Sequence, residues 1–220
     1  MKDSLLILSG GMDSTTMLYD YRDRIALAVG FDYGSNHNGR EIPMARLHCQ
    51  RLGIPYMVVP LDFMPRFLKS SLLAGADAVP TGQYDEQNMQ STVVPFRNGI
   101  MLSVAAGIAE SRGLRHLMMA NHSGDHSIYP DCRPAFVQAM SQAVSAGTYE
   151  GIDLVAPYTG LTKTDIALRG KLLGIDYSET YSCYKGGEHH CGQCATCLER
   201  RQALREAGIA DTTLYDSDTH

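Results

Sequence analysis

Short apolar runs alternate along the chain with longer segments in which apolar residues recur every three or four positions. A run such as Leu5 to Leu8, apolar at every position, is typical of a parallel strand that is covered on both faces. Strands are predicted over residues 5–8, 25–31, 56–59, 116–120 and 154–156, and helices over residues 15–21, 40–52, 63–72, 98–112, 133–146 and 162–173. Because strands and helices alternate, the sequence predicts an α/β fold with a five-stranded, parallel, doubly wound sheet and right-handed crossovers.

Three of the segments between the predicted strands contain residues that predict further local features. Cys49 repeats with Ala45 on one face of the helix predicted over residues 40–52, so it is predicted to lie in the core. Thr162 and Asp165 have the spacing of a capping box at a helix start. The stretch over residues 75–92 is rich in Gly, Asp, Pro and Gln and is long for a connection, which is typical of a lid.

The first predicted strand runs directly into small and polar residues, Ser9 to Ser14. Gly10 and Gly11 allow backbone conformations that other residues disfavour and let the chain approach a ligand closely. The first amides of the following helix have no partner within the helix, and together with the helix dipole they form an anion site. The serines and Thr15 add hydroxyl donors, while Asp13 either caps amides or orients a magnesium ion. The segment indicates a phosphate-binding loop, and a plain glycine turn is the alternative.

The spacing of this loop excludes two common nucleotide-binding motifs. The chain has no G-x-x-x-x-G-K-[ST] loop, and the G-x-G-x-x-G dinucleotide motif is absent at this position. In a parallel sheet, ligands bind beyond the carboxyl ends of the strands, where the strand order reverses. We therefore expect the polar segments after the strands to converge on one cleft: residues 9–15, 32–37, 121–131 and 158–163.

Composition narrows the class of protein. The chain has 220 residues, of which 44% are hydrophobic and 20% charged, as in an ordinary globular protein. A net charge of −5 argues against a dedicated nucleic-acid surface, which is normally basic. The first residues lead straight into a strand without room for a signal peptide, and no apolar run approaches the length that spans a bilayer. We expect a cytoplasmic protein that contacts neither a membrane nor nucleic acid directly.

Four of the six cysteines gather near the C-terminus: Cys183, Cys191, Cys194 and Cys197. In a reducing compartment, clustered cysteines indicate a metal or catalysis rather than disulfides. Four thiolates at this spacing fit a closed, tetrahedral, structural zinc site, and an iron–sulfur cluster is the rival because C-x2-C-x2-C also begins a ferredoxin motif. We expect a nucleotide-binding domain over residues 1–178 and a zinc-binding module over residues 179–220.

The phosphate loop and the cysteines together resemble the 7-cyano-7-deazaguanine synthase (QueC) family of the ATP pyrophosphatase superfamily. The resemblance covers nearly the whole chain and rests on Ser9 to Thr16, Asp32-Tyr33-Gly34, Pro95-x-Arg97-Asn98, Tyr129 to Pro134, Leu161-Thr162-Lys163, and Ser182-Cys183-Tyr184-x-Gly186-Gly187 with the terminal cysteines. It implies an adenine nucleotide α-hydrolase-like fold, a structural Zn²⁺ and a homodimer. The implied reaction converts 7-carboxy-7-deazaguanine and ammonia into the nitrile, with two ATP and Mg²⁺, through an adenylated acid and an adenylated amide.

The resemblance also assigns expected roles to individual residues. Lys163, at a predicted helix start, is expected to face the α-phosphate, unless it is a solvated surface lysine. Arg97 is expected to grip a phosphate or the substrate carboxylate. Asp125 or Asp131 is expected to accept hydrogen bonds from the amino edge of the deazaguanine, unless Asp131 simply pairs with Arg133. The expected catalytic residues are Lys163, Arg97 and Asp131; the nucleotide-binding residues are Leu8, Ser9, Gly10, Gly11, Met12, Asp13, Ser14, Thr15, Thr16, Asp32 and Tyr33; and the substrate-binding residues are Asp125, Tyr129, Asp131 and Arg133.

Five positions depart from the residues that the family commonly has: Ser35, Asn36, Phe96, His126 and Ile128. Since these are expected near the cleft, a related 7-deazapurine or a product that stops at the amide stays open. Two further alternatives are an ATP-dependent tRNA-modifying enzyme and a non-catalytic nucleotide-binding module stabilised by zinc. His37, His122 and His126 follow predicted strands and are candidates for proton transfer, or else ordinary core or surface histidines.

Overall fold

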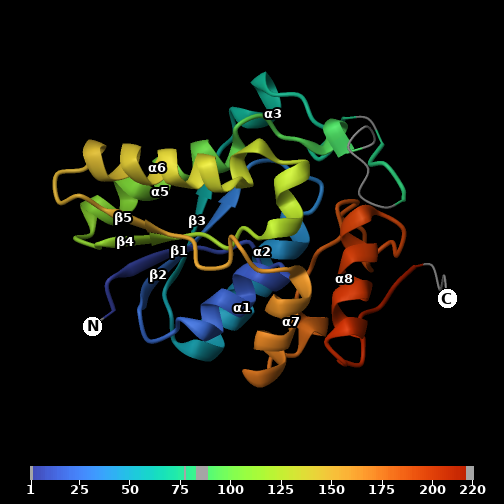
Figure 1. Ribbon diagram of the computed structural model, residues 1–220. Coiled ribbons are helices and arrows are strands. Elements are labelled where there is room, and N and C mark those ends of the chain that lie inside the picture. The colour runs from blue at the N-terminus through green and yellow to red at the C-terminus, as the bar shows by residue number, and fades with distance from the viewer. Residues whose placement is uncertain (1, 77, 83–88, 217–220) are drawn as a thin grey trace.

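The computed structural model describes residues 2–76, 78–82 and 89–216 (Figure 1). The strands are β1 (Ser4–Ile7), β2 (Ile25–Asp32), β3 (Tyr56–Pro60), β4 (His116–Met118) and β5 (Asp153–Val155). The α-helices are α1 (Met12–Asp20), α2 (Asn38–Leu52), α3 (Met64–Phe67), α5 (Arg97–Ser111), α6 (Pro134–Gly147), α7 (Lys163–Leu172) and α8 (Ala195–Glu206). Short 3-10 helices are η1 (Gln90–Thr92), η2 (Ser123–Ser127), η3 (Pro130–Cys132) and η4 (Tyr177–Glu179).

The five strands form one sheet in the order β3-β2-β1-β4-β5, and every neighbouring pair is parallel. Helices α5 and α6 cover one face of the sheet, and α1, α2 and α7 cover the other (Figure 1). The strand order reverses around β1, which lies between β2 and β4. The α/β, doubly wound, parallel fold predicted from the sequence is therefore confirmed, and it puts the ligand site beyond the carboxyl end of β1.

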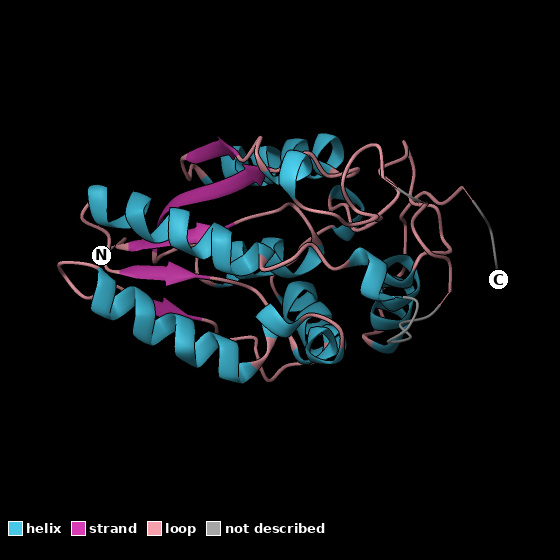
Figure 2. Cartoon of the chain, turned by 90° about the horizontal axis from the view of Figure 1, so that it is seen from above, coloured by secondary structure: helices cyan, strands magenta, loops and turns pink. Residues whose placement is uncertain are grey.

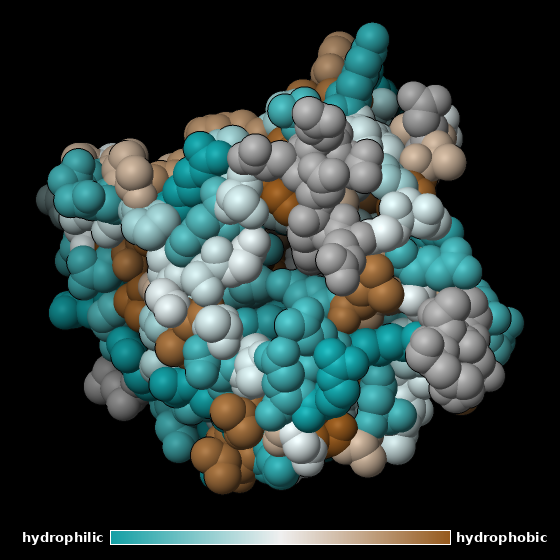
Figure 3. Space-filling view, turned by 45° about the vertical axis from the view of Figure 1, so that its right-hand side comes forward, coloured by the Kyte–Doolittle hydropathy of each residue, from teal (hydrophilic) through white to brown (hydrophobic). Residues whose placement is uncertain are grey.

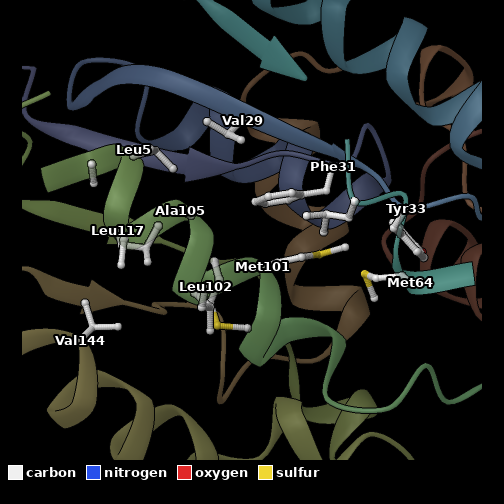
Figure 4. Packing of buried hydrophobic residues seen from close by; sticks show 14 of the residues in the cluster. Leu5, Val29, Phe31, Tyr33, Met64, Met101, Leu102, Ala105, Leu117 and Val144 are labelled. Carbon is white, nitrogen blue, oxygen red and sulfur yellow. The ribbon is translucent and has the colours of Figure 1, made fainter. Parts of the chain in front are cut away.

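Successive residues of β1 explain how the sheet is buried on both sides. Leu5 packs with Leu102 and Ala105 of α5 (Figure 4). Leu6 packs on the opposite face with Met17 of α1. Burial of each leucine contributes about 1.5–3 kcal/mol. Cys49 of α2 lies in this second cluster and is 1% exposed, as its position in the helical repeat predicted.

The capping box predicted at the start of α7 is present. The Thr162 hydroxyl accepts a hydrogen bond from the Asp165 backbone N–H at 3.1 Å, and the Asp165 carboxylate accepts one from the Thr162 backbone N–H at 2.8 Å. This box fixes the first residue of the helix, Lys163, at the edge of the sheet where the strands end.

The helix predicted over residues 63–72 is wrong beyond Phe67, because only Met64–Phe67 is helical. The serines that follow make other bonds: the Ser70 hydroxyl accepts from the Leu72 backbone N–H, and the Ser71 backbone N–H donates to the Ser91 carbonyl. Such local serine bonds compete with helix formation. Of the lid predicted over residues 75–92, residues 77 and 83–88 lie outside the described part of the chain.

The C-terminal residues share their core with the rest of the chain. Met12 of α1 and Ala167 of α7 pack with Ala203 and Leu204 of α8 in one buried cluster. Arg200 of α8 is 0% exposed and is held by polar groups of neighbouring segments. It donates to the hydroxyls of Thr180, Ser182 and Thr213 and to the Tyr177 carbonyl. Helix α8 is therefore fixed against the start of α1, where the predicted phosphate loop ends.

Contrary to the expectation from the sequence, one stretch of the described residues, Gln90–Ser111, is long and apolar enough to cross a membrane by length and composition. Its mean hydropathy is 1.3, and 44% of its most apolar window is buried inside the structure. Most of the stretch is α5, whose residues Met101, Leu102 and Ala105 pack on the sheet. We therefore interpret it as a core helix. On the face in Figure 3, hydrophilic residues predominate and hydrophobic ones form small separate groups.

Candidate active site

A cavity of about 220 Å³ lies beyond the carboxyl ends of β1, β2 and β4. Figure 2 shows the strand arrows pointing toward the side of the molecule where the C-terminal segment lies. Ten of the predicted site residues line this cavity: Leu8, Ser9, Gly11, Met12, Asp13, Ser14, Tyr33, Arg97, Asp125 and Lys163. Seven do not: Gly10, Thr15, Thr16, Asp32, Tyr129, Asp131 and Arg133. The topology therefore brings together residues from both ends of the chain.

The loop between β1 and α1 is held in shape by its own serines. The Ser9 hydroxyl accepts from the Gly11 backbone N–H at 3.1 Å and lies 3.0 Å from the Ser14 hydroxyl. Gly10 has a φ of +104°, and a Cβ at this position would overlap the Glu41 carbonyl oxygen of α2. Only glycine therefore fits here, because the loop packs directly against the backbone of α2 at Gly10. Gly11 has no side chain to cap α1, which leaves the first amides of that helix available to a ligand.

Lys163 is the centre of a charged cluster. Its Nζ lies 2.7 Å from Asp13 Oδ2, 3.2 Å from His122 Nε2 and 3.5 Å from Glu199 Oε2. Burial disfavours a charged lysine, but Asp13, Glu199 and Asp125 outweigh this and raise the pKa of Lys163 above its usual range. Burial also opposes ionisation of Asp13, and Lys163 and His122 outweigh it and lower the pKa of that carboxyl. Both groups are therefore charged at neutral pH.

Arg97 enters the cavity from the first residue of α5. Its Nη1 donates to the Tyr33 hydroxyl at 3.3 Å, and that hydroxyl lies 3.2 Å from His37 Nε2. Burial opposes the charge of Arg97, but the neighbouring tyrosines and Asp131 raise its pKa, so the guanidinium stays positive. Burial, and then Arg97, lower the pKa of His37 to about 3, so this imidazole is neutral at neutral pH.

Asp131 and its neighbours build the wall behind the cavity. The Asp131 carboxylate accepts from the Asn98 backbone N–H at 2.8 Å, at the start of α5. Asn98 donates to the Asp131 carbonyl and to Cys132 Sγ, and it lines the cavity itself. Arg133 is exposed and donates to the His126 carbonyl at 2.8 Å. The alternative of an Asp131–Arg133 pair is therefore not found among the described residues, and the two side chains make separate contacts that shape the loop.

Tyr129 lies one layer behind the cavity. Its hydroxyl is 3.1 Å from the Thr92 hydroxyl and 2.9 Å from the hydroxyl of Tyr184, which does line the cavity. Asp32 is exposed, and its carboxylate accepts from the Gly34 backbone N–H. Thr16 is buried and bonded to the Met12 carbonyl and the Tyr177 hydroxyl. These side chains hold neighbouring segments, and Tyr129 and Thr16 each contact a residue that lines the cavity.

None of the five departures from the family pattern lines the cavity. The Ser35 backbone N–H donates to the Asn38 side chain, and the Asn36 side-chain amide donates to the Ser71 carbonyl. Phe96 is 59% exposed, and it has a φ of +53°, which explains why glycine suits this position. His126 and Ile128 lie in and after η2. The departures therefore lie in segments around the cavity and contribute no side chain to its described wall.

The four predicted metal ligands come together. All four Sγ atoms lie within 4.8 Å of one another; the sulfurs are 3.4 Å apart in Cys194–Cys197 and 4.0 Å apart in both Cys183–Cys194 and Cys191–Cys197. A tetrahedral Zn²⁺ with bonds of about 2.3 Å places its sulfurs about 3.8 Å apart. Backbone N–H groups of Cys191 and Cys194 donate to sulfurs of the set, as thiolates require. The donors fit a metal ion such as zinc.

Sequence reasoning missed two carboxylates of the site. Glu41 lines the cavity from the first turn of α2. Glu199 lies two residues after Cys197, and its Oε2 reaches Lys163. Two features of the sequence pointed toward these residues: Glu41 lies four positions after His37, and Glu199 lies two positions after the last cysteine of the set. Neither signal shows that the side chain points into the cavity.

Comparison with known proteins agrees with this geometry. A family model described as queuosine biosynthesis protein QueC matches residues 3–208. A 7-cyano-7-deazaguanine synthase of Porphyromonas gingivalis is 60% identical over 98% of this chain and 98% of its own length. The synthases of Desulfotalea psychrophila and Methanoregula boonei are each 48% identical, over 98% and 97% of this chain and 99% of their own lengths.

Among solved structures, the fold resembles that of an NMN synthetase from Francisella tularensis, with a TM-score of 0.53, 12% identity, and coverage of 96% of this chain and 79% of that one. It also resembles the U34-tRNA thiolase NcsA of Methanococcus maripaludis, with a TM-score of 0.50, 15% identity, and coverage of 94% and 72%. At these identities the likeness concerns the fold alone.

Since the family model and relatives of up to 60% identity span almost the whole chain, this chain belongs to the QueC family of queuosine biosynthesis proteins.

Proposed function

We propose that the chain is an ATP-dependent ligase that converts 7-carboxy-7-deazaguanine and ammonia into 7-cyano-7-deazaguanine in the cytoplasm. The observation that carries the proposal is the convergence of the Ser9 to Ser14 loop, Lys163 and Arg97 on one cavity in a chain whose relatives are named for this product. A carboxylate is a poor electrophile, so one of its oxygens must first become part of a leaving group. Adenylation achieves this twice, first on the acid and then on the amide.

The loop is suited to bind the departing pyrophosphate. The first residues of α1 line the cavity, the helix start has no side-chain cap, and the hydroxyls of Ser9 and Ser14 add donors. Donors that are already in place cost little reorganisation as charge develops on the leaving oxygens. Asp13 Oδ1 is buried and makes no hydrogen bond within the described residues, which suits it to hold Mg²⁺. Bound there, Mg²⁺ would neutralise phosphate charge.

Lys163 is placed to stabilise the α-phosphate. Its ammonium group is already charged and is held near the loop by Asp13 and Glu199. A phosphoryl oxygen that enters the cavity takes the place of part of the attraction between Lys163 and these two carboxylates. Because the lysine is already charged and in position, it does not have to gain a proton or change rotamer. Such a fixed positive charge favours the transition state of phosphoryl transfer over the ground state.

The acceptor end of the cavity is suited to a carboxylated base. Arg97 offers a guanidinium to the substrate carboxylate, and Asn98 and Asp125 offer polar groups to the edges of the heterocycle. Met101 and Met119 line the same cavity and suit the flat faces of the ring. Asp131, Tyr129 and Arg133 are proposed to shape this wall rather than to contact the substrate.

The cysteine set is proposed to hold one structural Zn²⁺. The ion would fix residues 181–184 and the start of α8, both of which supply cavity residues: Tyr181, Ser182, Tyr184 and Thr196. We also propose a homodimer and no direct contact with nucleic acid, since the net charge is −5. The tRNA-acting proteins among the fold neighbours do not favour a tRNA substrate, because the likeness to them concerns the fold.

The test is to incubate the purified protein with ATP, Mg²⁺, an ammonium salt and 7-carboxy-7-deazaguanine, and to identify the products by mass spectrometry. The proposal expects the nitrile together with AMP and pyrophosphate. Formation of ADP would contradict adenylation, and accumulation of the amide alone would restrict the enzyme to the first half of the reaction. Binding of ATP without pyrophosphate release would favour the non-catalytic alternative.

A further inference from the structure

Glu41 is a carboxyl group in the cavity wall that the adenylation steps do not use. It lies in the first turn of α2, directly beside the phosphate loop, and its side chain is 15% exposed. Its Oε2 is 3.8 Å from His37 Nε2, too far for a hydrogen bond, and its Oε1 would lie 3.8 Å from a Cβ at Gly11. The carboxyl group thus lies in the cavity wall, beside the loop that is proposed to bind the phosphates.

The groups around Glu41 are aromatic or neutral, with one exception. His37 immediately precedes α2, Tyr33 follows β2, and Tyr56 is the first residue of β3. The exception is Arg97 of α5, whose charge lowers the pKa of Glu41. Burial has the larger effect and raises that pKa to about 8. The carboxyl group can therefore both gain and lose a proton near neutral pH.

The second substrate has a chemical requirement that matches these groups. Ammonia is almost entirely ammonium at neutral pH, and ammonium has no lone pair for attack on a carbonyl carbon. An enzyme that uses it must bind a small cation and remove a proton from it. A carboxylate supplies the opposite charge, the faces of aromatic rings attract a cation, and a neutral imidazole nitrogen can accept one N–H.

We propose that Glu41, flanked by His37 and Tyr33, binds the ammonium ion and acts as the base that releases ammonia for attack on the acyl adenylate. This inference rests on the proposed function. One N–H proton passes to the Glu41 carboxylate, and the freed lone pair forms the C–N bond with the acyl carbon. The C–O bond to AMP breaks, AMP leaves with the electron pair, and a second proton passes from nitrogen to the leaving phosphate. Glu41 then returns its proton to solvent.

The test compares two nucleophiles with the wild type and Glu41→Gln. Hydroxylamine is uncharged at neutral pH and needs no base, so it intercepts the acyl adenylate as a hydroxamate. Glu41→Gln is expected to lower amide formation from ammonium by about 100-fold, the size of a general-base contribution, and to leave hydroxamate formation within about twofold of the wild-type rate. Hydroxamate formation also reports that the variant is folded. The matched control is Glu150→Gln, an exposed glutamate between α6 and β5 that should change neither rate.

Three results would overturn the inference. Equal losses with both nucleophiles would show that Glu41 supports adenylation or the fold rather than proton removal. A loss with both nucleophiles that extra Mg²⁺ restores would make Glu41 a metal ligand. If the wild type forms neither amide nor hydroxamate and releases no pyrophosphate, the proposed function itself fails, and the inference fails with it. The last result is separate from the first two because it appears without any substitution.

Discussion

Lys163 Nζ lies 2.7 Å from Asp13 Oδ2, although the two residues are 150 positions apart in the chain. Asp13 is the second residue of α1, which follows the first strand of the sheet, and Lys163 is the first residue of α7, which follows the last. Both side chains are largely buried, with exposures of 20% and 14%. The parallel sheet brings the two helix starts to the same edge, so an acidic and a basic group meet where the phosphates are expected.

Replacement of Lys163 by methionine should abolish most of the adenylation activity. The methionine keeps the length of the stem but removes the charge proposed to stabilise the α-phosphate, so we expect a loss of about 10²- to 10³-fold in turnover. Pyrophosphate release measures this directly. Lys69→Met, at an exposed position outside the cavity, is the control. A Lys163→Met protein that is folded and turns over normally would remove this lysine from the mechanism.

The pH dependence of stability provides a separate test of Glu41. Its pKa is raised from 4.5 in the unfolded chain to about 8 in the folded protein. The folded state therefore holds the proton more tightly, and the resulting stability is fully present below pH 4.5 and lost as the pH rises through 8. Relative to the wild type, Glu41→Gln should gain about 1.4 kcal/mol of unfolding free energy per pH unit within this window.

Denaturant unfolding at pH 5.5 and pH 7.5 measures this gain. The difference between Glu41→Gln and the wild type should grow between the two conditions, while Glu150→Gln should follow the wild type at both. Parallel curves for all three proteins would mean that the Glu41 carboxyl titrates normally.

The cysteine set should hold one metal ion that the fold requires. Elemental analysis is expected to find one zinc per chain, and Cys194→Ser is expected to reduce the yield of folded protein rather than turnover alone, since structural zinc contributes folding free energy. A brown protein that contains iron would replace zinc with an iron–sulfur cluster. A zinc-free Cys194→Ser protein of normal stability would contradict the structural role.

Phe96 and Gly99 should be energetically coupled. The Phe96 ring lies over Gly99, where a Cβ would overlap it, and its centroid is 5.9 Å from that of Phe136. Gly99→Ala must displace the ring and should cost about 1 kcal/mol in the wild type. In a Phe96→Gly background the same alanine should be neutral or stabilise by about 0.5 kcal/mol, because alanine favours a helix. A double-mutant cycle by thermal unfolding measures the coupling, and equal effects in both backgrounds would refute it.

The sequence predicted the parts of this protein that depend on local pattern. Leu5 to Leu8 predicted a buried parallel strand, Gly10 and Gly11 a phosphate loop at its end, and Thr162 with Asp165 a capped helix start. Each depends on residues close together in the chain. The spacing of the four cysteines predicted their convergence for the same reason, because a metal ion constrains its ligands over short loops.

Other features depend on tertiary packing and could not be predicted in this way. Glu199 reaches Lys163 only because Arg200 is buried and fixes α8 against neighbouring segments. Asp131 is the last residue of a predicted cleft segment, yet its carboxylate accepts from the Asn98 backbone N–H at the start of α5. The family pattern indicated that Asp131 is part of the site. Whether such a carboxylate meets the substrate or a backbone N–H depends on the helix packed beside it.

If one ATP site activates the same carbon twice, oxygen atoms of the substrate must end in both AMP products. 7-Carboxy-7-deazaguanine with both carboxylate oxygens labelled with ¹⁸O is converted with an excess of ATP and ammonium, and AMP is analysed by mass spectrometry. Two AMP are expected for each nitrile, each carrying one ¹⁸O, because each adenylation transfers one substrate oxygen to phosphorus. A single labelled AMP per nitrile, or label in inorganic phosphate with formation of ADP, would contradict it.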